Sequence, residues 1–192
     1  MIRLAVVLTE AFADWEVGQL TASARTEFGF DVVTAAPGGA EVRSMGGLRV
    51  TPDTAAEALR AEAFDGLVLC GGMIWETEKA PDLKPVIADF MARGKLVAGI
   101  CGATLALAKA GALNNAAHTS NALRFIADLP GYSGHAHYKD APAAVRDGML
   151  VTAPGSAPTT FAAEIYRALD FRNEDLDQYL LMFGAEHQPK AA

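Results

Sequence analysis

The sequence lacks several features that would assign it to a large class of proteins. Its 192 residues include two cysteines, Cys70 and Cys101, too few for a disulfide framework. No apolar run reaches about 18 residues, so no membrane-spanning helix is predicted. Basic residues are scattered and the formal net charge is −7, which gives the chain no electrostatic reason to bind nucleic acid or an anionic membrane.

Nucleotide-binding motifs are missing as well. The sequence contains no Gly-x-x-x-x-Gly-Lys-Ser/Thr phosphate loop. Gly99, Gly102 and Thr104 give part of a dinucleotide-binding pattern, but their spacing departs from Gly-x-Gly-x-x-Gly, and the next glycine is Gly111. We therefore predict that the protein needs no cofactor. A Rossmann-like cofactor binder is kept as an alternative, which failure to bind nicotinamide and flavin cofactors would exclude.

The N-terminal segment lacks the features of a secretory signal. Residues 1–8 are largely apolar, but no basic n-region or small-residue cleavage site accompanies them, and Glu10 and Asp14 follow closely. We expect this segment to be the first buried strand. We also expect a cytoplasmic protein in which both cysteines are free thiols.

What the sequence does have is an alternation of short apolar runs with helical patterns. Strands are predicted over residues 3–8, 31–35, 66–70, 96–100, 117–120 and 149–152, a hairpin over 42–50, and helices over 15–26, 55–60 (capped by Thr54), 81–93, 102–110, 121–127, 161–169 and 174–183. Because the strands are almost continuously apolar, the sheet should be mostly parallel and covered on both faces. The prediction is a single-domain α/β three-layer sandwich over residues 1–184, followed by a flexible tail over 185–192.

The most informative segment, residues 95–107, has the form of a nucleophile elbow. An apolar, strand-like run is followed at once by Cys101 and Gly102 and then by a helix of small and apolar residues. Gly99 and Gly102 allow a tight turn and a close approach of strand and helix. Cys101 would lie at a helix N-terminus, where backbone N–H groups and the helix dipole favour the reactive thiolate over a buried, inert thiol. Cys70, with no such helix behind it, is predicted to be structural.

Glu16 is the predicted partner of Cys101. A carboxylate in the first turn of a helix is ordinarily solvated, but the apolar residues on either side of Glu16 permit partial burial. A carboxyl group beside the sulfur would titrate with it as a pair and supply a general acid/base. Spacing alone leaves Asp14 and Glu10 as competing candidates.

Glycines provide the predicted binding groups for an oxyanion. Gly71 and Gly72 follow a buried strand and Gly102 follows the cysteine, so their backbone N–H groups could bind a developing negative charge. In parallel sheets, ligands bind beyond the carboxyl ends of the strands, where these loops would converge. A simple tight turn is the alternative explanation for the glycine pair.

The remaining candidates are side chains of the predicted pocket. Trp75 could wall it or anchor a surface loop, and Asn121 and His118 belong to a segment whose end could line it. One of the pair His135 and His137 could orient or protonate the thiol, and His137 is the candidate for the pocket. His135 and His137 are also spaced to chelate a metal, but no third or fourth ligand has compatible spacing, so no metal site is predicted.

These motifs resemble those of the ThiJ/PfpI superfamily. The resemblance is carried by the elbow at Ala98–Ala103, by Ala13–Glu16 and by the Leu69–Gly72 turn, and it extends to about Leu169. It implies the class I glutamine amidotransferase-like fold with a flavodoxin-like sheet. Trp75, together with residues 118–121, is similar to a bacterial subgroup often labelled amidotransferase-like.

The resemblance implies roles for individual residues. Cys101 matches the family's nucleophile and Glu16 its carboxylic acid partner, while Gly71, Gly72 and Gly102 match its anion-binding backbone positions. The helix that carries Glu16 resembles the family's usual dimer face, so a homodimer is implied.

Two departures from the family pattern bear on activity. Protease-like members carry a histidine directly after the cysteine, and Gly102 stands there in this chain. A glutaminase triad is also incomplete, since residues 153–156 contain no His-x-Glu. His137 falls near a site-adjacent histidine of the deglycase/glyoxalase-like members.

We therefore predict a cysteine-dependent, cofactor-independent hydrolase or lyase that is not a peptidase. Its expected substrates are small carbonyl or amide-type compounds, processed by glyoxalase/deglycase-like or amidase-like hydrolysis. The alternative is an oxidative-stress sensor or chaperone-like protein that uses an oxidisable Cys101.

Overall fold

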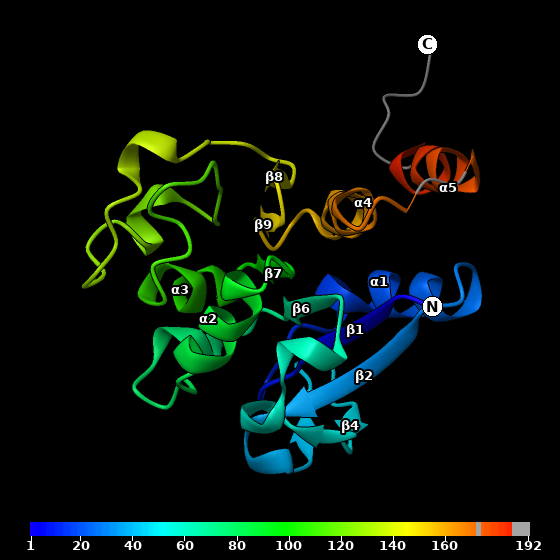
Figure 1. The fold of residues 1–192 in the computed structure, drawn as a ribbon, viewed down its shortest axis with the longest axis horizontal. Coiled ribbons are helices and arrows are strands. Elements are labelled where there is room, and N and C mark those ends of the chain that lie inside the picture. Colours follow the sequence, from blue (N-terminus) through cyan, green and yellow to red (C-terminus); the bar gives the residue numbers. More distant parts are fainter. Residues whose placement is uncertain (172–173, 186–192) are drawn as a thin grey trace.

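The centre of the fold is a seven-stranded sheet in the order β5-β2-β1-β6-β7-β9-β8, seen in a computed structural model that describes residues 1–171 and 174–185 (Figure 1). The strands are β1 (Arg3–Val7), β2 (Asp31–Ala36), β5 (Thr54–Ala55), β6 (Gly66–Leu69), β7 (Leu96–Ile100), β8 (Val145–Asp147) and β9 (Leu150–Ala153). All neighbours run parallel except β8 and β9, which pair antiparallel at one edge. The predicted mostly parallel sheet is confirmed.

Helices cover both faces of this sheet (Figure 1). On one side lie α1 (Asp14–Thr26) and α4 (Pro158–Ala168), with α5 (Glu174–Gly184) packed on α4, and on the other side lie α2 (Lys84–Ala92) and α3 (Ala103–Lys109). The strand side chains alternate between two apolar cores. Leu4 and Val6 of β1 pack with α1 and α4, whereas Ala5 and Val7 pack with α2 and α3. The three-layer α/β sandwich is therefore confirmed.

The parallel strands deliver several loops to one edge. β1, β6, β7 and β9 are neighbours, and each ends at its carboxyl terminus on this edge. The segments that follow them are residues 8–13, 70–72, 101–102 and 154–157. The loops predicted to carry the chemistry thus meet above the centre of the sheet.

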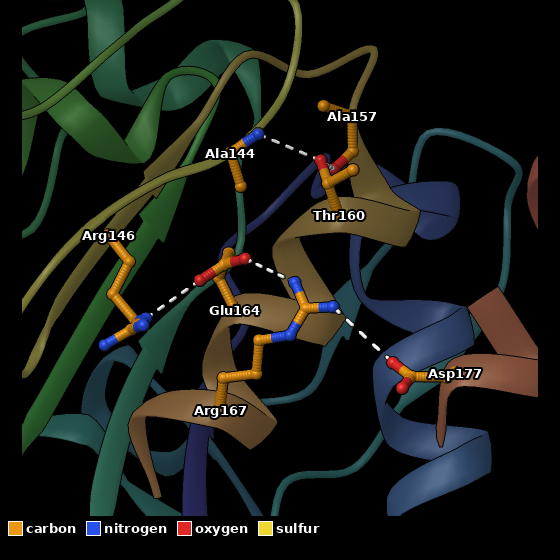
Figure 2. Close-up of polar contacts among 7 residues, drawn as sticks. All are labelled: Ala144, Arg146, Ala157, Thr160, Glu164, Arg167 and Asp177. Carbon is orange, nitrogen blue, oxygen red and sulfur yellow. Dashed lines mark hydrogen bonds and ion pairs between the residues drawn. The ribbon is translucent and has the colours of Figure 1, made fainter. Parts of the chain in front are cut away.

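Polar contacts attach the neighbouring elements to α4 (Figure 2). The Glu164 carboxylate accepts hydrogen bonds from Arg146 of β8 at 2.8 Å and from Arg167 at 2.7 Å. Arg167 also pairs with Asp177 of α5 at 3.7 Å. Such partly exposed ion pairs contribute only about 0–1 kcal/mol each. Burial of apolar residues such as Phe161 therefore holds α4 in place.

The remaining elements are short. β3 (Val42–Arg43) and β4 (Arg49–Val50) form the predicted hairpin. Single 3₁₀ turns occupy Pro37–Gly39, Ala56–Ala58, Ala61–Ala63, Met73–Glu76, Leu123–Phe125 and His135–His137. Of the predicted tail over 185–192, all but Ala185 lies outside the described residues.

The predicted helix over 55–60 is wrong, and the predicted helix over 81–93 is present but begins three residues later. Thr54 caps no helix: Thr54–Ala55 forms the edge strand β5, which pairs with Ala35–Ala36 of β2, and 3₁₀ turns follow. Open backbone groups at the sheet edge here outweigh the helix propensity of alanine. The second helix begins at Lys84 and not at Pro81, because a start at residue 81 would put Pro85 inside the helix without an N–H to donate.

The segment 117–127 also differs from the prediction. In place of a strand there is one isolated bridge between His118 and Tyr138, and in place of a helix there is the turn Leu123–Phe125. Asn121 lies between them with its side chain bonded to the elbow. Tertiary hydrogen bonds have here replaced the local ladder that a strand or helix would supply.

Candidate active site

Cys101 lies at the tip of a tight turn between β7 and α3, as the elbow motif predicts. Its φ of 56° is in the left-handed region, which costs a residue with a side chain about 1–3 kcal/mol. Its N–H donates to the carbonyl of Ala153 at 2.9 Å, and its carbonyl accepts from the N–H and hydroxyl of Thr104 at 3.1 and 2.7 Å. These bonds hold the strained backbone and leave the cysteine half-buried.

The residue after the cysteine has no room for a side chain. An ideal Cβ built on Gly102 would lie 2.5 Å from the carbonyl oxygen of Gly72 and 3.3 Å from Cβ of Trp75. The elbow is therefore pressed against the Gly71–Gly72 turn. A histidine at position 102 could not be accommodated without a shift of the backbone.

The carboxyl group of Glu16 lies beside the sulfur of Cys101. The Glu16 side chain is fully buried. A Cβ built on Gly155 would lie 2.8 Å from Glu16 Oε1 and 2.9 Å from Cys101 Sγ, so both groups face this glycine. A Cβ on Gly71 would overlap Glu16 Oε2 and lie 2.7 Å from Cβ of Cys101. Of the three carboxylates considered from the sequence, Glu16 is the one at the sulfur.

The two competing carboxylates serve the hairpin. Asp14 accepts the N–H of Gly46 at 2.8 Å, and Glu10 accepts the N–H of Arg43 at 3.0 Å. Both bonds tie residues 10–14 to the segment 43–46. These side chains have structural roles that account for their positions.

Burial sets the titration of the Glu16–Cys101 pair. It raises the pKa of Glu16 to about 7, while the nearby Cys101 thiol and Gly71 N–H lower that pKa by less. Neither Glu16 oxygen has a partner of full hydrogen-bond geometry within the described residues. The pKa of Cys101 is raised to about 11. Burial is the main cause and the neighbouring Glu16 adds to it, while hydrogen bonds from Asn121 and from the Gly102 N–H act in the opposite direction. Desolvation therefore outweighs the thiolate-favouring effect expected of the elbow.

These two pKa values determine which of the two groups carries a proton at neutral pH. At neutral pH, Cys101 is a thiol and Glu16 is divided between its acid and carboxylate forms. The carboxylate form can accept the thiol proton, and its charge then disappears from beside the sulfur. The arrangement can supply a nucleophile together with its own general base.

Asn121 is the third polar side chain at the sulfur. Its Nδ2 donates to Cys101 Sγ at 3.1 Å, and its Oδ1 accepts the N–H of Gly155 at 2.9 Å. The predicted pocket residue Asn121 therefore contacts the sulfur of Cys101 directly. A hydrogen bond to sulfur stabilises the thiolate and lowers the pKa of Cys101.

The other predicted pocket residues lie elsewhere. Trp75 is buried behind the elbow, donates from Nε1 to the carbonyl of Cys70 at 2.9 Å, and lines a separate hollow of about 520 Å³ beside α3. His137 is exposed, and its carbonyl accepts the N–H of His118 at 3.3 Å. His118 is buried, with ring nitrogens 2.7 Å from the Ala116 carbonyl and 2.8 Å from the Tyr132 hydroxyl. Among the described residues, none of the polar contacts of Cys101 or Glu16 involves a histidine.

Two residues at the site were missed from the sequence. Gly155 lies directly over the sulfur, and Trp15 donates from Nε1 to the Gly155 carbonyl at 3.0 Å. The segment 153–156 was considered only for an absent His-x-Glu. The available signal was a glycine just beyond the carboxyl end of a central strand.

Neither a metal centre nor a membrane-spanning helix is present in the described ranges 1–171 and 174–185. No group of three or more His, Cys, Asp or Glu side chains there could hold a metal ion. No helix in the same ranges is long and apolar enough to cross a membrane.

The mostly parallel sheet, the cysteine elbow and the adjoining buried carboxyl group place the chain among α/β proteins with a cysteine at a strand–helix elbow. Comparison with known sequences then gives the family. The DJ-1/PfpI family matches residues 2–168. The chain belongs to this family, as the resemblance implied.

Individual relatives agree with this assignment. The chain is 36% identical over 166 residues to "Uncharacterized protease YoaZ" of Bacillus subtilis, covering 82% of this chain and 79% of that protein. It is 33% identical over 193 residues to "Uncharacterized protease YdeA" of the same organism, covering 97% and 94%. Among solved structures, the DJ-1 superfamily protein Atu0886 from Agrobacterium tumefaciens superposes with a TM-score of 0.95 at 48% identity, over 98% of this chain and 100% of that one.

Proposed function

We propose that the protein is a cysteine-dependent enzyme that acts on small carbonyl or amide-type substrates without a cofactor. The observation that carries this proposal is the Glu16 carboxyl group, fully buried beside the sulfur of the half-buried Cys101. A fully buried carboxyl without a full hydrogen-bond partner is costly, and such sites are common where a pKa must be tuned. We propose that this unfavourable burial is retained because Glu16 serves as a general base.

The proposed reaction begins with proton transfer from the Cys101 thiol to the Glu16 carboxylate. The sulfur then forms a bond to the carbonyl carbon, and the carbonyl electron pair moves onto oxygen. The backbone N–H groups of Gly72 and Gly102 and the Asn121 amide are the donors for this oxyanion. Gly71, assigned to the same task from the sequence, directs its N–H toward Glu16 and so acts on the base. Glu16 returns its proton to the oxyanion or to the leaving group.

The names of the curated relatives raise protease activity, and the site argues against it here. The Cys-His pair of protease-like members requires a histidine directly after the cysteine. Position 102 has no room for a side chain, because a Cβ there would lie 2.5 Å from the Gly72 carbonyl oxygen. His118, the buried histidine, is committed to Ala116 and Tyr132. Small aldehydes and amides are the better-matched substrates, because a single carboxyl base is sufficient for their attack.

The proposal includes a homodimer formed through α1 and a cytoplasmic setting. Trp15, Met45 and Leu48 lie on or near α1 and are exposed by 53%, 42% and 61%. Exposed apolar side chains of this size favour an interface. The two cysteines are free thiols in the structure, which is compatible with a reducing compartment.

Turnover by a Cys101→Ser variant tests the enzyme proposal. Methylglyoxal and a panel of small amides serve as substrates, and Cys70→Ser is the matched control because Cys70 is fully buried and distant from solvent. We expect Cys101→Ser to lose turnover on any substrate that the wild type processes, and Cys70→Ser to keep it. Undiminished turnover by Cys101→Ser would remove the mechanism.

A redox sensor is the second candidate, and the same geometry favours it. The sulfur of a half-buried cysteine beside a carboxylic acid can be oxidised by two equivalents of peroxide to a sulfinic acid, whose oxygens the Glu16 hydroxyl would bind. Intact mass after peroxide treatment, in wild type and Glu16→Gln, measures this reaction. Oxidation at one site together with no turnover on the substrate panel would favour the sensor over the enzyme.

A further inference from the structure

The loop between β9 and α4 is held by two side chains at a single residue. Gly155 receives a hydrogen bond at its carbonyl from Trp15 Nε1, at 3.0 Å. Its N–H donates to Asn121 Oδ1, at 2.9 Å. Both backbone polar groups of this glycine are thus occupied by side chains from distant parts of the chain.

The Gly155 N–H determines how the Asn121 amide is oriented. An amide presents an acceptor oxygen and a donor nitrogen, and the two can exchange places by rotation. Because Oδ1 accepts from Gly155, Nδ2 is the group left to face Cys101 Sγ, at 3.1 Å. The reverse orientation would place an oxygen lone pair against a developing thiolate.

We propose that Trp15 is a positioning residue for the nucleophile: its indole N–H fixes Gly155, which orients Asn121 so that the amide donates to the sulfur of Cys101. The single donor of the Trp15 indole is bonded to the Gly155 carbonyl and not to the sulfur or to an oxyanion donor, so Trp15 acts through other residues. The inference rests on Cys101 being the reactive group of the proposed function.

The hydrogen bonds that link Trp15, Gly155, Asn121 and Cys101, here called the relay, start from the same helix that carries Glu16. Glu16, the next residue, is buried beside the sulfur, whereas Trp15 is half-exposed and reaches the loop from the outer side. Two consecutive residues of α1 therefore serve the site: Glu16 is the proposed base, and Trp15 fixes the loop that orients the Asn121 donor. The helix is in turn bonded to α4 through Thr159, whose hydroxyl donates to Gln19 Oε1 at 2.9 Å.

Alkylation of Cys101 by iodoacetamide tests the relay without any substrate. Cys70 is fully buried, so the native protein is labelled at Cys101, which peptide mass analysis verifies. The rate is measured between pH 6 and 11 for wild type, Asn121→Ala, Trp15→Phe and the double variant. Phenylalanine keeps an aromatic ring and removes the N–H donor. Asn114→Ala is the matched control, since Asn114 also bridges two backbone groups, Gly131 and Ser133, away from the sulfur.

Losing a hydrogen bond to a thiolate should raise the thiol pKa by about one, which lowers the alkylation rate at pH 8 about tenfold in Asn121→Ala. Trp15→Phe should lower the rate by a smaller factor, about threefold, because the amide is loosened and not removed. In the double variant, Trp15→Phe should add nothing to Asn121→Ala, since it has no amide left to orient. Asn114→Ala should match the wild type.

Two outcomes would overturn the inference. One is a Trp15→Phe rate equal to that of the wild type. The other is a double variant in which the two effects multiply, which would mean that Trp15 acts independently of Asn121. Melting temperatures of all variants verify that they are folded. Loss of turnover in Cys101→Ser bears on the proposed function and leaves this test unaffected, because alkylation requires only the sulfur.

Discussion

The charge of Glu16 should govern how the stability of this protein depends on pH. The pKa of the carboxyl is about 7 in the folded state and 4.5 in the ordinary, solvated state that the unfolded chain provides. Below pH 4.5 the group is protonated in both states. Between pH 4.5 and 7 the folded protein holds a proton that the unfolded chain has released, so raising the pH favours unfolding. Above pH 7 both states are ionised and the loss is complete.

The size of this effect follows from the two pKa values. At about 1.4 kcal/mol for each pKa unit, a rise from 4.5 to about 7 corresponds to about 3 kcal/mol of unfolding free energy. This is a large part of the roughly 5–15 kcal/mol that stabilises a typical domain. Glu16→Gln removes the titration while keeping a side chain of nearly the same shape. Relative to wild type, the variant should therefore gain about 3 kcal/mol between pH 4.5 and 8.

Urea unfolding at intervals from pH 4.5 to 8.5 measures the gain. The quantity compared is the unfolding free energy of Glu16→Gln minus that of wild type, because the other titrating groups cancel in this difference. Glu41→Gln, at an exposed carboxylate, gives the baseline for replacing a carboxyl by an amide. A difference that stays constant within about 0.5 kcal/mol over this range would refute the assignment of a raised pKa to Glu16. A stabilised variant that has also lost turnover would show that the carboxylate is kept for chemistry.

Two further predictions concern the elbow and the base. Gly102→Ala should cost about 1–3 kcal/mol by overpacking against the Gly72 carbonyl and lower the melting temperature, whereas Gly18→Ala on α1, where a Cβ meets nothing within 4 Å, should be neutral or stabilising. Equal melting temperatures for the two variants would contradict the close contact at the elbow. For any substrate found, kcat/KM should rise with pH through an apparent pKa of about 7, since the Glu16 carboxylate is the form that accepts the thiol proton. A profile with its midpoint elsewhere, unchanged in Glu16→Gln, would assign the base to another group.

The elbow and the central strands could be predicted because their signals are local. Buried parallel strands are continuous apolar runs, and the turn at Cys101 needs glycine beside it wherever strand and helix approach closely. The sequence limits the carboxylate partner of Cys101 to Glu10, Asp14 and Glu16. Only burial distinguishes these three residues, because Glu10 and Asp14 accept hydrogen bonds from the segment 43–46 whereas Glu16 is buried beside the sulfur.

Other features escaped because they depend on contacts between distant segments. β5 forms only because the edge of β2 is open, and the extended segment around Asn121 is held by the elbow and by Gly155. β8 did carry a local signal, the glycine at position 148. It begins the two-residue turn Gly148-Met149 between β8 and β9 with a φ of 57°, a conformation that glycine favours at this position of a hairpin. Trp15 had no local signal at all, since its partner lies 140 residues away in the chain.

Because no histidine among the described residues makes a polar contact with Cys101 or Glu16, the proposed mechanism places its acid–base chemistry on Glu16. With the pKa of Cys101 raised to about 11 and that of Glu16 to about 7, a free thiolate is scarce at neutral pH. In the proposed mechanism, the initial proton transfer to the carboxylate is therefore unfavourable, and the sulfur attack that follows draws it forward by moving the negative charge to an oxygen that backbone N–H groups can bind. A reactive aldehyde carbon tolerates such a weakly ionised nucleophile better than a peptide bond does. The same two pKa values that make Glu16 expensive to bury thus favour small, electrophilic substrates over peptides.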